Sequence, residues 1–88
     1  MQEIVNLNEI IKQEILEVIK NQINANDPPE TKITYDRLIK AGYSEVETNQ
    51  LIGQCVLHEI YKVVEDQEPF NEQRFKKNLE NLPKEPIE

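Results

Sequence analysis

This sequence has few of the residues that build covalent or metal-bound frameworks. It contains one cysteine, Cys55, one histidine, His58, two glycines and no tryptophan. A lone cysteine excludes an intrachain disulfide framework and a four-cysteine zinc site. His58-Glu59 begins like the zinc motif His-Glu-x-x-His, but Lys62 stands where the second histidine belongs. No glycine-rich phosphate loop is present either, so we expect no metal and no cofactor.

Positive charge is also scarce. Ten lysines and arginines stand against seventeen aspartates and glutamates, which gives a formal net charge of −7. Affinity for nucleic acid and for anionic membrane surfaces comes largely from Lys and Arg. We therefore expect neither as a partner, whereas a basic or neutral protein partner stays open.

Long hydrophobic runs are absent. The first ten residues, MQEIVNLNEI, have neither a basic region nor an extended apolar stretch. We expect no signal peptide and no transmembrane helix, and hence the cytoplasm as the compartment.

Helical periodicity dominates the 88 residues. It predicts one all-α domain over 1–88, a small bundle of about four helices with a long central third helix. The expected helices span 5–24, 29–41, 44–66 and 71–81, followed by a frayed tail over 83–88. Ser44 and Glu47 form a capping box, Asp27 and Asn71 are expected caps, and Phe70 and Phe75 have the spacing of a hydrophobic staple. Gly42 suits the left-handed end of the second helix.

The long helix over 44–66 is apolar on two sides, which predicts a central position. Leu51 and Cys55 point roughly opposite to Ile60, in line with His58 and Lys62. Its broader apolar face consists of Val46, Ile52, Val56, Leu57, Ile60, Val63 and Val64.

The helix over 5–24 carries more apolar residues than one face requires. They cover well over half of its circumference, and a short bundle has difficulty covering that much Ile and Val within one chain. We therefore expect a homodimer, although another protein could cover the same surface. The residues expected at this interface are Ile11, Ile15, Val18, Leu51, Cys55 and His58.

Catalysis has little support in the residue pattern. Cys55 and His58 lie three residues apart on one helix and could touch, but no third group and no oxyanion hole accompany them. We expect no enzyme; a small-ligand or catalytic protein that uses Cys55 and His58 is the alternative. Solvated charge is the expected role of paired carboxylates such as Glu65 and Asp66, or Glu45 and Glu47. Arg74, Lys76 and Lys77 are likewise expected to stay in solvent.

A second alternative is a binding module built on the turn at 38–44. This turn resembles that of helix-turn-helix DNA readers, but the following helix carries Glu45, Glu47 and Glu59 and has no Lys or Arg before Lys62. The turn is also similar to the loop of ubiquitin-associated domains, with Ala41 in place of methionine, although the helix after it is about twice the length expected there.

Four segments carry a family resemblance. They are Asn21-Gln22-Ile23 running into Asp27-Pro28-Pro29-Glu30-Thr31, then Tyr35-Asp36-Arg37-Leu38, then 42–53 from Gly42-Tyr43-Ser44 to Leu51-Ile52-Gly53, and finally 69–75. Together they resemble the bacterial domain-of-unknown-function family numbered 1841. The resemblance covers most of the chain, and it implies a compact helical protein of the bacterial cytoplasm with no established activity.

Overall fold

The computed structural model describes the backbone of residues 7–87 and the side chains of residues 9–87. Within this range the chain forms α1 (Leu7–Ala25), α2 (Pro29–Lys40), α3 (Glu45–Glu65) and α4 (Glu72–Asn81). The prediction of an all-α bundle with a long third helix is confirmed. The described helix bounds differ from the predicted ones by one residue at most, while the expected start of the first helix at residue 5 lies outside the described range.

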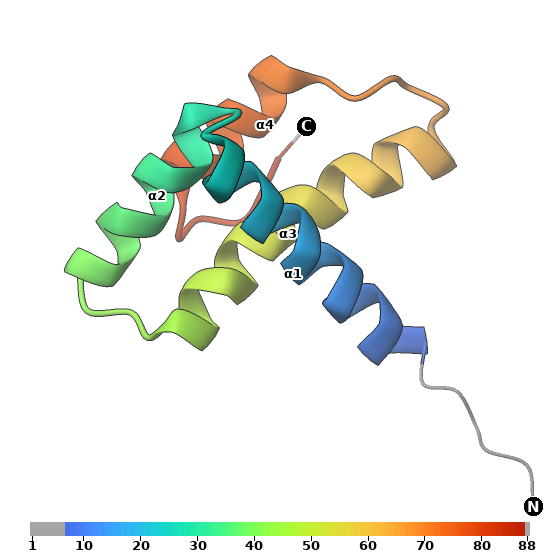
Figure 1. Cartoon of the computed structure of the whole chain (residues 1–88). Coiled ribbons are helices and arrows are strands. Elements are labelled where there is room, and N and C mark those ends of the chain that lie inside the picture. The colour runs from blue at the N-terminus through green and yellow to red at the C-terminus, as the bar shows by residue number, and fades with distance from the viewer. Residues whose placement is uncertain (1–6, 88) are drawn as a thin grey trace, which may run out of the picture.

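The arrangement is set by the crossing of α1 over α3. Figure 1 shows these two long helices crossing near their middles, with α2 to one side and α4 behind. Both α2 and α3 contact the three other helices. At the crossing a Cβ placed on Gly53 would come within 3.2 Å of Ile15 Cγ2, so the missing side chain lets the helices approach closely.

Local signals end and begin the helices. At the end of α1, Asn26 adopts a φ of 52° while the amides of Asn26 and Asp27 bond to the carbonyls of Ile23 and Gln22, which is a Schellman motif. Gly42, with a φ of 105°, ends α2 in the same way. The expectation that Asp27 caps α2 was wrong. Pro28 occupies the N-cap without a side-chain hydrogen bond, and Asp27 belongs to the preceding motif.

Three predicted side-chain signals are confirmed. Ser44 accepts a hydrogen bond from the Glu47 N–H and the Glu47 carboxylate accepts one from the Ser44 N–H, which completes the capping box of α3. Asn71 caps α4 by accepting a hydrogen bond from the Arg74 N–H. The staple rings of Phe70 and Phe75 lie 5.7 Å apart between their centroids.

The core lies where α1, α2 and α4 meet the inner face of α3. Its buried apolar members come from all four helices and the residue after α4: Ile19, Leu38, Ile52, Cys55, Val56, Phe75, Leu79 and Leu82. The buried side of α3 runs through Thr48, Ile52, Cys55, Val56 and Glu59. Only Ile52 and Val56 of these belong to the broader apolar face predicted for this helix. Val46, Ile60, Val63 and Val64 are exposed, because α1 crosses that face at a single point and leaves the rest uncovered.

Polar contacts complete the packing of α2 and α4. In α2 the buried residues are Thr31, Thr34 and Leu38, whereas Ile39 is exposed. Arg37 of α2 donates to the carbonyls of Leu79 and Leu82 at 3.0 and 3.1 Å, which satisfies acceptors at the end of α4.

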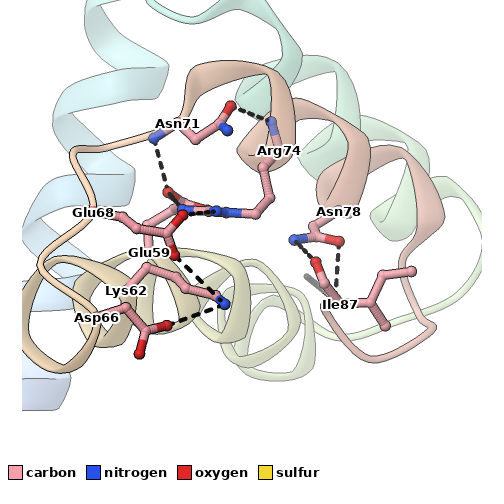
Figure 2. A network of polar contacts seen from close by, with 8 residues as sticks. All are labelled: Glu59, Lys62, Asp66, Glu68, Asn71, Arg74, Asn78 and Ile87. Carbon is pink, nitrogen blue, oxygen red and sulfur yellow. Dashed lines mark hydrogen bonds and ion pairs between the residues drawn. The ribbon is translucent and has the colours of Figure 1, made fainter.

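The segment after α4 folds back along it. Asn78 is buried, and its side-chain amide donates to the carbonyl of Ile87 at 3.2 Å while its oxygen accepts from the Ile87 N–H at 3.1 Å (Figure 2). The expectation of a frayed tail is therefore wrong for the described part of the tail, because Asn78 binds its backbone.

Candidate interaction surface

An apolar groove lies beside the crossing of α1 and α3. It has a volume of about 300 Å³ and its wall is formed by both helices together with Phe70, which precedes α4. The lining residues are Val18 and Gln22 of α1, Val56, Glu59, Ile60, Val63 and Val64 of α3, and Phe70 and Phe75. Val18, Ile60, Val63, Val64 and Phe70 are exposed, so the groove is open to solvent in the single chain.

The polar residues of the groove wall are Gln22 and Glu59, and Glu59 forms an ion pair with Arg74. Glu59 is only 3% exposed. Its Oε2 accepts from Arg74 Nε at 2.6 Å, its Oε1 accepts from Arg74 Nη2 at 2.9 Å, and Oε1 also accepts from the Asn71 N–H at 3.0 Å (Figure 2). Such a two-point contact between guanidinium and carboxylate fixes both side chains in one geometry. The pair therefore holds the start of α4 against the second half of α3, and this also positions Phe70, which precedes α4.

These contacts set the protonation of both groups. Burial alone would raise the pKa of Glu59, but the hydrogen bonds from Arg74 and the Asn71 N–H, together with the Arg74 charge, hold it below its ordinary value. The hydrogen bond to Glu59 raises the pKa of Arg74 above its ordinary value. The pair is thus ionised at neutral pH, and the expectation that Arg74 stays in solvent was wrong.

Carboxylates outnumber cations around this pair. Lys62 lies within 3.8 Å of both Asp66 and Glu68, and Arg74 lies between Glu59 and Glu68 (Figure 2). Lys76 of α4 lies within 3.8 Å of both Glu30 and Glu72. Each of these three cations therefore faces two carboxylates, and the local excess charge is negative.

The six residues expected at an interface are distributed over different environments. Val18 lines the groove, and Ile11, on the same side of α1, is exposed. Ile15 and Leu51 are half-buried because both pack against the core. Cys55 has an exposed fraction of 0% and offers no surface to a partner, so its assignment to an interface was wrong.

Cys55 and His58 do not form an accessible pair. Burial, together with the charge of Glu59, raises the pKa of the Cys55 thiol to about 12, so the thiolate that nucleophilic chemistry requires is scarce at neutral pH. His58 is half-buried on the side of α3 that faces the tail, beside a hollow of about 250 Å³ lined also by Tyr61 and Pro86. Its Nε2 is buried and has no hydrogen-bond partner among the described residues.

Other classes of site are not seen in the part of the chain that the structure describes. Residues 7–87 contain no group of three or more His, Cys, Asp or Glu side chains placed to hold a metal ion. None of the four described helices combines the length and apolarity that crossing a membrane requires.

Sequence reasoning missed most of the groove. It placed Ile60, Val63 and Val64 on a covered face and Arg74 in solvent, and it did not assign Phe70 to any surface. One feature of the sequence could have indicated the groove. The last part of α3 is rich in apolar residues, and the loop that follows it is too polar to cover them.

Comparison with known proteins adds no assignment: no family model, curated protein or solved structure matches this chain. The resemblance to the domain-of-unknown-function family numbered 1841 stays a prediction.

Proposed function

We propose that this protein is a non-catalytic interaction module that binds a protein surface through the groove between α1 and α3. The observation that supports the proposal is the groove itself. Five apolar side chains from α1, α3 and the loop before α4 are exposed around one hollow, although the chain also buries an apolar core, of which Val56 and Phe75 reach the groove. Contiguous exposed apolar surface of this kind is typical of protein contact sites.

Two occupants fit the proposal. One is a second copy of the chain, which is the homodimer expected from the sequence, and the other is a different protein. The inaccessible Cys55 thiol gives no support to the alternative of a catalytic protein.

Site-specific photo-crosslinking in the native cell tests this function. Val64 lines the groove and is 67% exposed, while Val46 lies near the other end of α3, outside the groove, and is 66% exposed. A photoreactive amino acid at position 64 should give a discrete protein adduct, and the same amino acid at position 46 should give none. Adducts from both positions, or from neither, would contradict the proposal. The adduct mass then tells a second copy from another protein.

A further inference from the structure

The groove combines an apolar wall with a negatively charged border, and this combination restricts what can occupy it. From Glu59 to Glu68 the chain has four carboxylates and one cation, Lys62. Arg74 adds a second cation, while Glu72 is paired with Lys76 and does not count toward the excess. The border of the groove therefore carries an excess of negative charge. Each of its two cations already contacts two carboxylates.

We infer that the groove binds an amphipathic helix of another protein whose polar face is rich in Lys and Arg. The inference rests on the proposed function and names the partner class for the same surface. The apolar stripe of such a helix would cover Val18, Ile60 and Val63, as helices do when they dock into apolar grooves. Its cations would lie near Asp66 and Glu68, where they find carboxylates in excess.

A second copy of the chain is a poorer electrostatic match. Each copy has a formal charge of −7, so docking one copy on another brings like charge together. Like charge at the border of an interface disfavours the wrong partner and slows its association. A basic helix removes this repulsion and gains attraction instead.

The geometry of the border supports a preformed site. Lys62 and Asp66 at the end of α3 are joined by an ion pair of 3.2 Å, and Arg74 holds the start of α4 against Glu59 at 2.6 Å. These contacts position Phe70 at one end of the groove without a partner present. A partner helix thus docks on a surface whose shape and charge are already set.

Binding of a designed helical peptide tests the inference. The probe has Leu and Phe at i, i+3, i+4 and i+7 and Lys or Arg on its other face; its control has the same apolar stripe with Glu in place of each cation. Fluorescence anisotropy should show the basic peptide binding the full chain at least about tenfold more tightly than the acidic one. Raising the salt concentration should weaken binding of the basic peptide.

Two exposed positions on one helix supply the matched variants. Val64→Asn places a neutral polar group on the groove wall and should weaken binding of the basic peptide by about tenfold or more. Val46→Asn makes the same change at equal exposure outside the groove and should leave binding unchanged. Circular dichroism of both variants checks that the fold is retained.

The outcomes separate this inference from the proposed function. Equal affinity for the basic and acidic peptides, or binding that Val64→Asn leaves intact, would overturn the inference. A crosslink from position 64 to a second copy of the chain would also overturn it, while the proposed interaction function would stand. Absence of any crosslink from position 64 would contradict both the inference and the proposed function.

Discussion

Arg74 and Glu59, fifteen residues apart in sequence, form a two-point ion pair with contacts of 2.6 and 2.9 Å between α4 and α3. The Asn71 N–H donates to the same carboxylate, so the first turn of α4 is fixed to α3 by three hydrogen bonds. This arrangement positions Phe70 and Phe75 at the groove and links the stability of the fold to the shape of the proposed binding surface.

Replacing Glu59 with Gln should destabilise the protein. The variant removes the negative charge from a buried side chain that accepts three hydrogen bonds, and it leaves Arg74 without its main counter-charge. The expected loss in the free energy of unfolding is on the order of 2–3 kcal/mol. Urea unfolding at pH 7, followed by circular dichroism, measures the loss. Glu65→Gln, which neutralises an exposed carboxylate on the same helix, is the control and should change stability little. Equal stability of Glu59→Gln and wild type would show that the ion pair contributes nothing net.

The contribution of Glu59 should depend on pH in a defined direction. Because the folded-state pKa of Glu59 lies below the ordinary value of 4.5, its ionised form stabilises the fold fully above that value. The stability is lost as the pH falls below 4.5 through the lower folded pKa. The difference in unfolding free energy between wild type and Glu59→Gln should therefore shrink on acidification, and a constant difference from pH 7 to acid would contradict this assignment.

Gly53→Ala tests the close crossing of α1 and α3. Alanine favours a helix by about 1 kcal/mol over glycine, but here its Cβ would meet Ile15 Cγ2 at 3.2 Å. We expect Gly53→Ala to be more favourable by about 1 kcal/mol in an Ile15→Ala background than in wild type, because the contact is then removed. A double-mutant cycle from chemical unfolding measures this coupling. Additive effects would mean that the helices do not meet at these residues.

Arg37→Met should weaken the attachment of α2 to α4. The variant removes two charge-assisted hydrogen bonds to the carbonyls of Leu79 and Leu82, with an expected loss of about 1–2 kcal/mol. Lys40→Met removes a cation from the same helix at an exposed position and should have little effect. Thermal unfolding of the two variants compares them, and equal midpoints would argue against a role of Arg37 at the end of α4.

Cys55 should react slowly with a thiol reagent while the protein is folded. Its side chain is buried and burial raises its pKa to about 12, so reaction requires the chain to open. With Ellman's reagent at pH 8, the rate should rise with urea in parallel with unfolding. Since Cys55 is the single thiol of the chain, the signal reports this position alone. Rapid reaction of the native protein would restore the alternative of chemistry at Cys55 and His58.

The features that sequence predicted well are local ones. The capping box of Ser44 and Glu47, the cap at Asn71 and the positive φ of Gly42 each depend on residues within one turn, so their spacing in sequence suffices to find them. Phe75 and Leu79, which are buried, lie four residues apart in the short helix α4, so they share one narrow face of it.

The features that sequence missed depend on how helices cross. The face of α3 that periodicity assigned to the core is partly exposed, because α1 meets it only near Gly53. Glu59 lies on the buried side of α3 because Arg74, fifteen residues later, supplies a matching cation. The sequence around either residue alone does not predict this pairing. Asn78 likewise is buried because the tail returns to bind it. The groove results from this tertiary arrangement, which cannot be predicted from the local sequence pattern of α1 or of α3.

The most direct test of the central claim is the mass in solution, measured by light scattering over a dilution series from millimolar to low micromolar concentration. If the open groove binds a basic partner, the protein alone should have the mass of one chain at every concentration. Addition of the basic helical peptide should give a complex of one chain with one peptide. A dimer that persists at low micromolar concentration and dissociates in Val64→Asn would contradict this account and would instead support the homodimer expected from the sequence.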